Sequence, residues 1–202
     1  MSATTTAAVT TDVLATYIHG EMTFNAVSST AAAIRRDISR PDTYWNGIQT
    51  WIAMVGYGKP WDHKPHILAT YGAWSADATA ARRFPHDTWS NIHYGYVGRA
   101  VGFASWTLRA GAGGAQFKND ADKAKEAYAA RAARTLMDPN YWSRRMDKIG
   151  DADALGALDP PEDQVAIMIG ADLFDAKGAT VTAAHILAAI RAVPGKLATK
   201  PL

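Results

Sequence analysis

The sequence predicts a mainly α protein: a compact single helical domain with long irregular loops and at most a short β-hairpin. Three observations lead to this prediction. Apolar residues recur at helical spacing in several long stretches, almost nothing alternates with a period of two, and Gly and Pro gather in the segments between them. The chain has 202 residues, 48% of them hydrophobic, which is enough for one sizeable core.

The first helix is predicted to follow a loose Ser/Thr/Ala tail at 1–10 and to begin at Thr11 or Asp12. It stops before Pro41, because a residue that precedes proline disfavours the helical conformation. A second helix is predicted at 43–55 from the spacing of its apolar side.

The middle of the chain has a different composition. GYGKPWDHKPH at 56–66 is dense in Gly and Pro and is predicted to be irregular, with a short helix to follow at 77–83. NIHYGYVGRAVGF at 91–103 has helical spacing, and the helix it opens is predicted to run to about Ala110 and to end in GAGG at 111–114.

The last third of the chain is also predicted to be helical. A charged, alanine-rich helix covers 119–134, and helix restarts near 141. DPPEDQ at 159–164 opens another helix, and a final amphipathic helix at 180–193 is terminated by Pro194.

The composition excludes several classes of protein. Without Cys there is no disulfide framework and no thiolate site, and a net charge of +2 is too small for a dedicated nucleic-acid binder. The N-terminus lacks the basic and apolar regions of a secretory signal, and no apolar run approaches the ~20 residues of a membrane span. We expect a protein made in the cytoplasm without a signal peptide and without stable membrane insertion.

Glu21 is the first candidate functional residue. Helical geometry places it on the apolar face of the first helix, with Asn25 one turn further on. A carboxylate there is costly unless it is paired, metal-bound or protonated. The structural interpretation is an edge position paired with an arginine; the functional one is an acid that works in a site.

The loop WDHKP, which begins at Trp61, is the second candidate functional feature. Flanking prolines stiffen its backbone, as positioned side chains require. Asp62 is suited to bind a metal or orient a histidine, His63 or His66 to act as a base, and Lys64 to stabilise an anion. The structural alternative is a surface turn anchored by its tryptophan.

His93 is the third. It lies on a helical stripe with core valines, where a lone histidine is more often a packed residue than a catalyst. Gly95, Gly98 and Gly102 share a neighbouring face, which is flat and lets another helix or a ligand approach the backbone closely.

The segment DPPEDQ is the fourth candidate functional feature. Capping accounts for most of it, with Asp159 as the N-cap, Pro160 at the first helical position and Glu162 in the first turn. Asp163 and Gln164 exceed what capping needs.

These segments occur together, in this order, in one family: the chain resembles the bacterial polymorphic toxin type 44 domain. The resemblance covers roughly residues 12–172, and Pro160 stands where the family more often has a second Asp. The matching segments are IHGEMTFNA (18–26), WDHKP (61–65), NIHYGYVGRAVGF (91–103), LRAGAGGAQ (108–116) and DPPEDQ (159–164).

The resemblance implies an antibacterial effector toxin, with a catalytic domain at 11–175 and an appended C-terminal helix and tail at 176–202. Such toxins are loaded on a secretion apparatus such as type VI or an Rhs-type carrier, and a cognate immunity protein protects the producer. We therefore expect secretion by a non-classical route into target bacterial cells. Members are described as predicted nucleases, with a divalent metal ion, Mg or Ca, as the plausible cofactor.

Two hydrolase mechanisms fit these residues. In a nuclease, Glu21, Asp62 and Asp163 gather around the metal, His93 or His63 is the base, and a cationic side chain, Lys64 or Arg99, stabilises the phosphorane. In a peptidoglycan glycosidase, Glu21 is the general acid and Asp62 the second carboxylate. A third interpretation is a non-enzymatic helical binding module. The expected substrate-binding residues are Asn25, Trp61, Tyr94, Tyr96, Arg99 and Gln116.

Overall fold

The computed structural model describes residues 9–112 and 159–202. Its elements are α1 (Thr11–Ala26), α2 (Ser29–Ile38), α3 (Tyr44–Val55), α4 (Lys64–Tyr71), β1 (Trp74–Asp77), β2 (Arg82–Pro85), α5 (His86–Ala100), a helical segment at 105–112, α9 (Pro161–Lys177), the 3₁₀ turn η1 (Gly178–Thr180), α10 (Ala183–Ala192) and β3 (Lys200–Pro201). The predicted mainly α fold is confirmed.

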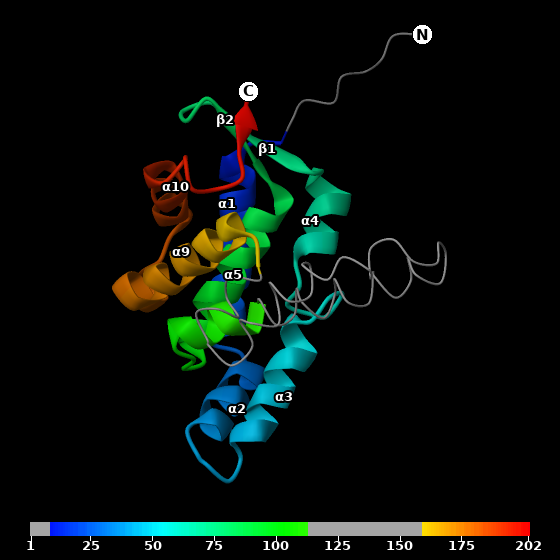
Figure 1. Cartoon of the computed structure of the whole chain (residues 1–202), viewed down its shortest axis with the longest axis vertical. Coiled ribbons are helices and arrows are strands. Elements are labelled where there is room, and N and C mark those ends of the chain that lie inside the picture. The colour runs from blue at the N-terminus through cyan, green and yellow to red at the C-terminus, as the bar shows by residue number, and fades with distance from the viewer. Residues whose placement is uncertain (1–8, 113–158) are drawn as a thin grey trace, which may run out of the picture.

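Helix α5 is the centre of the fold. It lies between α1 and α9 (Figure 1), and 11 of its 15 residues are buried. A helix buried on nearly every side has lost the single polar face of a surface helix. A side chain on α5 is therefore held in place by several neighbouring elements.

The glycine face of α5 receives another helix. A Cβ placed on Gly95 would lie 1.9 Å from the carbonyl oxygen of Ile167 on α9, and one on Gly170 of α9 would lie 2.0 Å from the carbonyl oxygen of Ile92 on α5. The two backbones therefore touch where these helices cross, which only glycine permits. Of the two partners predicted for this face, a helix or a ligand, the structure shows a helix at Gly95.

The three strands form one small antiparallel sheet in the order β1-β2-β3. Trp74 pairs with Pro85 at one end of the hairpin, and Arg83 pairs with Lys200 of β3. The predicted helix at 77–83 is wrong, because these residues form the hairpin turn and parts of both strands, with Ala81 at φ 50°. A hairpin was the one β element that the predicted fold class allowed.

Several helix boundaries also differ from the prediction: α4 begins at Lys64, inside the stretch 56–66 that was predicted to be irregular, and α5 begins at His86 instead of 91. The first helix ends at Ala26 instead of running on towards Pro41, since the hydroxyl of Ser28 accepts a hydrogen bond from the Ala31 N–H (3.1 Å) and starts α2. Helix α5 ends at Ala100 instead of reaching Ala110, because Gly102 adopts a φ of 107°, which turns the chain before it becomes helical again at 105.

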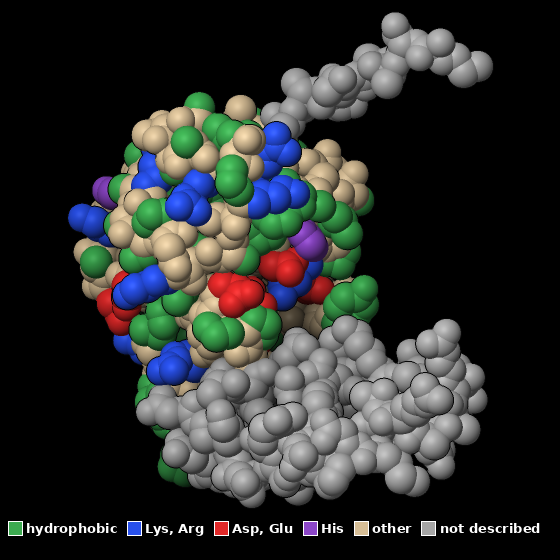
Figure 2. Space-filling view, turned by 45° about the horizontal axis from the view of Figure 1, so that its top comes forward, with side chains coloured by type: hydrophobic (Ala, Val, Ile, Leu, Met, Phe, Trp, Pro, Cys, Tyr) green, Lys and Arg blue, Asp and Glu red, His purple; other side chains and the backbone are tan. Residues whose placement is uncertain are grey.

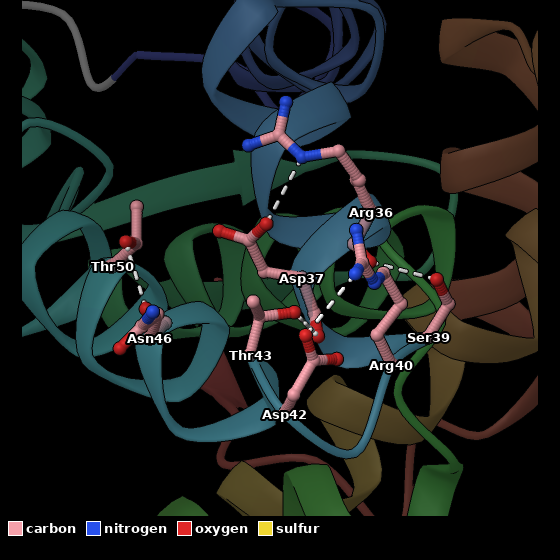
Figure 3. Close-up of polar contacts among 8 residues, drawn as sticks. All are labelled: Arg36, Asp37, Ser39, Arg40, Asp42, Thr43, Asn46 and Thr50. Carbon is pink, nitrogen blue, oxygen red and sulfur yellow. Dashed lines mark hydrogen bonds and ion pairs between the residues drawn. The ribbon is translucent and has the colours of Figure 1, made fainter.

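Helices α2 and α3 form a pair at the end of the molecule away from the sheet (Figure 1). Figure 3 shows the polar turn that joins them. The hydroxyl of Thr43 donates to the Asp37 carbonyl (2.9 Å), while Arg36 and Arg40 pair with nearby aspartates on the surface. These contacts close the turn and leave the predicted helix at 43–55 confirmed as α3.

The C-terminal segment packs into the same core. Ile186, Leu187 and Ile190 of α10 are buried, and Arg191 donates a 2.8 Å hydrogen bond to the fully buried carboxylate of Asp77. At the end of the chain the ammonium of Lys200 lies over the Trp74 ring. The helix predicted at 180–193 is thus present, and it is a structural part of the domain.

Candidate functional site

Three polar side chains stand one above another on α1. Tyr17, Glu21 and Asn25 are four residues apart, so helical geometry places them on one side of the helix. Each of them reaches towards a histidine that comes from elsewhere in the chain. The site is built where α1 meets the start of α4 and the middle of α5.

His63 reaches α1 from the position just before α4. Its side chain is 6% exposed, and its Nδ1 lies 2.9 Å from the hydroxyl of Tyr17. Within the described residues its Nε2 makes no hydrogen bond, and it lies 4.0 Å from Oε2 of Glu21. Burial lowers the pKa of His63 to about 4, against a smaller opposing effect of Asp62. The imidazole is therefore neutral near pH 7, and its approach to Glu21 is not an ion pair.

His93 reaches the same place from α5. It is fully buried, its Nε2 lies 3.0 Å from the side-chain amide nitrogen of Asn25, and its ring packs edge-on against that of His63 with 4.2 Å between centroids. Burial, and then the neighbouring His63, hold the pKa of His93 well below its usual value. His63 and His93, both predicted to be catalytic and His93 with the alternative of a core residue, are thus neutral neighbours in one cluster.

Glu21 is the accessible member of the cluster, with 36% of its side chain exposed. Its Oε2 accepts a long hydrogen bond (3.5 Å) from Asn25 and is the atom that faces His63. The cluster therefore has buried imidazoles at its base and one carboxylate at its opening. We define the Glu21 cluster as Tyr17, Glu21, Asn25, His63 and His93.

Asp62 is turned away from this cluster. One carboxylate oxygen accepts from the Gly58 N–H (2.8 Å) and the other from the Lys64 N–H (3.1 Å). Both oxygens are used to fix the loop that carries His63 and to start α4. Asp62 shapes the loop, and its predicted catalytic role has no support in its contacts.

Lys64 belongs to a second group of charges. Burial raises the pKa of Asp163 to about 6; Lys64 opposes the rise, while Asp159 and Asp87 add to it. Burial also raises the pKa of Asp159, whose carboxylate accepts a 2.8 Å hydrogen bond from Gln164. The predicted N-cap role of Asp159 is wrong, because α9 begins one residue later, with Pro160 as its N-cap.

The predicted metal ligands Glu21, Asp62 and Asp163 do not come together. In the part of the chain that the structure describes, no three His, Asp or Glu side chains gather so that they could hold a metal ion. The oxygens of Asp62 are already used by backbone N–H groups, and Asp163 stands with Asp159 and Lys64 instead of with Glu21. This ligand set does not fit a metal ion.

Most of the predicted substrate-binding residues make contacts within the fold. Trp61 and Tyr96 are buried in the core, and the hydroxyl of Tyr96 donates to the Gly178 carbonyl (2.8 Å). Tyr94 donates to the Leu108 carbonyl (3.1 Å), and Arg99 pairs with Asp175 (2.8 Å) and so ties α5 to α9. The role of these four residues in substrate binding stays a prediction. Gln116 lies outside the described residues, and Asn25 is part of the Glu21 cluster.

A groove of about 530 Å³ lies along α9, apart from the Glu21 cluster. It is lined by apolar side chains such as Met168 and by Arg109, Asp159 and Lys196. None of its lining residues belongs to the Glu21 cluster. We therefore assign the candidate site to the side-chain chemistry of that cluster and not to the groove.

Comparison with protein families decides the identity of the domain. The family described as bacterial toxin 44 matches residues 50–176, which is more than half of the chain. The chain belongs to this family. Comparisons with curated proteins and with solved structures gave no match. The predicted resemblance is confirmed, and the chain is a bacterial toxin.

The matched range contains only part of the toxin's Glu21 cluster. His63 and His93 lie inside it, whereas Tyr17, Glu21 and Asn25 lie before residue 50. Tyr17 is also the member that the sequence analysis missed as a site residue. Its four-residue spacing from Glu21 was the available signal, but a tyrosine on an apolar face is ordinary core composition.

Within the described residues, no helix of the toxin has both the length and the apolar character that crossing a membrane requires.

Proposed function

We propose that this toxin is a nuclease that cleaves RNA, with Glu21 and His63 acting on the attacking oxygen. The observation that supports this most is the 4.0 Å between Oε2 of Glu21 and the unpartnered Nε2 of His63. That spacing is too long for a direct hydrogen bond. An oxygen about 2.8 Å from each atom would bridge them at an angle near 90°, and because Nε2 is buried, the side chains that cover it have to move aside when this oxygen enters.

The protonation states suit acid–base chemistry on such an oxygen. His63 is neutral because its pKa is lowered to about 4, so it does not hold the Glu21 carboxylate in an ion pair. A carboxylate and a neutral imidazole on one oxygen can remove its proton and orient it for attack. The other residues of the Glu21 cluster hold these two in place.

RNA is the nucleic acid for whose cleavage the carboxylate of Glu21 and the imidazole of His63 suffice. Its 2′-hydroxyl is a built-in nucleophile: when it loses its proton to the enzyme, its oxygen attacks the adjacent phosphorus and the 5′-oxygen leaves, taking up a proton from solvent. The products are a 2′,3′-cyclic phosphate and a free 5′-hydroxyl. Because the predicted three-acid metal site does not fit the structure, no step of this reaction passes through a metal ion.

The peptidoglycan alternative is less well supported by the structure. A glycosidase needs two working carboxylates at the scissile bond. The second one predicted, Asp62, has both oxygens bound to backbone N–H groups of its own loop. Basic side chains are scattered over the face in Figure 2, with no continuous basic field among its described residues. RNA binding would therefore rest on local contacts.

Three substrates separate these functions. The purified full chain is incubated with total RNA, plasmid DNA and peptidoglycan sacculi, each with and without EDTA. We expect RNA to be cleaved equally in both conditions, with 2′,3′-cyclic phosphate ends detected by mass spectrometry. Release of muropeptides with intact RNA, or RNA cleavage that EDTA abolishes, would contradict the proposal.

Glu21→Gln tests the site itself. Removing the base should lower the RNA cleavage rate by about 100-fold or more. The matched control is Asp12→Asn, an acid-to-amide change at an exposed position on the same helix. Full activity in Glu21→Gln, or an equal loss in both variants, would argue against Glu21 as the base.

The proposal includes the delivery and the partners that such a toxin needs. We expect carriage by a type VI or Rhs-type secretion component into competing bacteria, and neutralisation by a cognate immunity protein. Family membership supports this expectation. Expression of the toxin in a sensitive bacterial cytoplasm should arrest growth, and co-expression of the immunity protein encoded beside it should restore growth.

A further inference from the structure

Tyr17 holds the rear nitrogen of His63. The two are joined at 2.9 Å, from the phenol oxygen to Nδ1, and Tyr17 makes no other hydrogen bond within the described part of the chain. Burial, and then the charge of Glu21, raise the pKa of Tyr17 to about 12. The phenol therefore keeps its proton at physiological pH and has one hydrogen to donate.

The direction of this hydrogen bond decides where His63 carries its own proton. A neutral imidazole has one N–H and one lone pair. If Tyr17 donates to Nδ1, the N–H is on Nε2; if Tyr17 accepts, Nε2 has the lone pair instead. Oε2 of Glu21 faces Nε2 at 4.0 Å. An N–H directed towards a carboxylate is attracted to it and a lone pair is repelled, so the surroundings favour the tautomer with Nε2–H.

Asn25 acts on His93 in a parallel way. With its amide nitrogen 3.0 Å from Nε2 of His93, Asn25 donates there, which puts the proton of that ring on Nδ1, a buried atom without a hydrogen-bond partner among the described residues. The same amide nitrogen lies 3.5 Å from Oε2 of Glu21, which supports this orientation of the amide, since two acceptors face it. At intervals of one turn, helix α1 thus presents the hydroxyl donor of Tyr17, the carboxylate of Glu21 and the amide donor of Asn25.

We propose that Tyr17 is a positioning residue that holds His63 in its Nε2–H tautomer, so that Glu21 is the base and His63 is a neutral hydrogen-bond donor. An oxygen between the two then accepts from His63 and donates to Glu21, which a hydroxyl with one proton satisfies completely. As Glu21 takes that proton, the Nε2–H stabilises the charge that develops on the oxygen. This assignment of roles rests on the proposed nuclease function; the tautomer itself does not.

The tautomer is measured directly by ¹⁵N NMR of the full chain labelled at histidine. The His63 signals are assigned by their loss in His63→Gln. We expect a protonated, pyrrole-type Nε2 and an unprotonated, pyridine-type Nδ1. In Tyr17→Phe, which removes one oxygen and keeps the ring, both nitrogens should move towards the averaged shifts of a tautomer mixture.

Tyr71→Phe is the matched control. The Tyr71 ring lies 5.6 Å from that of Tyr17, and its hydroxyl makes no hydrogen bond to His63. Its variant should leave the His63 shifts unchanged. A pyrrole-type Nδ1 in the wild-type chain, or unchanged His63 shifts in Tyr17→Phe, would overturn the proposal.

Activity provides the second measurement. Tyr17→Phe should lower kcat for RNA by about 10- to 100-fold with little change in KM, as loss of an orienting partner does. If the toxin cleaves no RNA but His63 shows the Nε2–H tautomer, the proposed function fails and the tautomer assignment stands. If RNA is cleaved and Tyr17→Phe has full kcat, the positioning role is refuted and the nuclease proposal stands.

Discussion

Gly95→Ala should be one of the most damaging small substitutions in this protein. Its Cβ would lie 1.9 Å from the carbonyl oxygen of Ile167, whereas ordinary contacts begin at 3.4 Å, so α5 and α9 must move apart by about 1.5 Å. Both sides of the contact are backbone, and neither can rotate away. A gap of 0.5–1 Å already removes a quarter to a half of a dispersion contact.

The expected loss follows from where the two helices cross. Ile92 and Ile167 are buried beside the crossing, and a shift of this size would loosen the packing of both. Overpacking alone costs about 1–3 kcal/mol, and with these lost contacts we expect about 4 kcal/mol. That is a large part of the stability of a typical domain.

The same substitution at Gly20 is the control. Gly20 lies in the middle of α1, and a Cβ there would meet nothing within 4 Å. Gly20→Ala should therefore stabilise the protein by about 0.5–1 kcal/mol, because alanine loses less entropy in a helix. Urea unfolding followed by tryptophan fluorescence gives both free energies. Equal unfolding midpoints for the two variants would refute the close crossing of α5 and α9.

Two further predictions concern buried acids. Asp163→Asn should stabilise the toxin by about 2 kcal/mol above pH 6, because the folded chain raises the pKa of this acid to about 6 and so disfavours its charge. The stability that protonated Asp163 contributes is full below about pH 4 and is lost as the pH rises through 6. The melting temperatures of the wild-type chain and of Asp163→Asn should therefore agree at pH 4 and differ at pH 7. Arg191→Leu should destabilise the fold by about 2 kcal/mol or more in urea unfolding, because it leaves the buried Asp77 carboxylate without its partner. Adding Asp77→Asn should recover part of that loss; no recovery would contradict the ion pair.

Local sequence signals predicted much of this structure. Apolar spacing located α3 and α10, and the scarcity of period-two alternation predicted the small sheet. Predictions were wrong where one local signal competed with another. The apolar pattern of the first helix continues past Ala26, but the Ser28 hydroxyl accepts from the free N–H of Ala31 and so starts a new helix, which divides the predicted one in two.

The sequence predicted most residues of the candidate site, but it did not predict which of them lie together. Glu21 and Asn25 were out of place on an apolar face, where a polar group needs a partner, whereas His63 in its loop and His93 on its core stripe each had a structural alternative. Nothing local shows that these four meet, whereas Asp62 and Lys64, which stand beside His63 in the sequence, turn elsewhere. Neighbouring side chains on a loop point in different directions, so adjacency in sequence says little about a shared site.

The sequence by itself determined the class of the fold, its family and the presence of polar residues on the apolar face of the first helix. Helical periodicity reveals these features because it depends only on residues that are close together in the chain. Only the tertiary structure decided what each unusual residue does. Of the predicted glycine face, Gly95 is where α9 crosses α5, as its contact with Ile167 shows, whereas Gly98 lies against Leu108. His93 shares its buried position with His63 and Asn25. Contacts between residues about 30 to 70 positions apart depend on how helices cross, which no local pattern specifies.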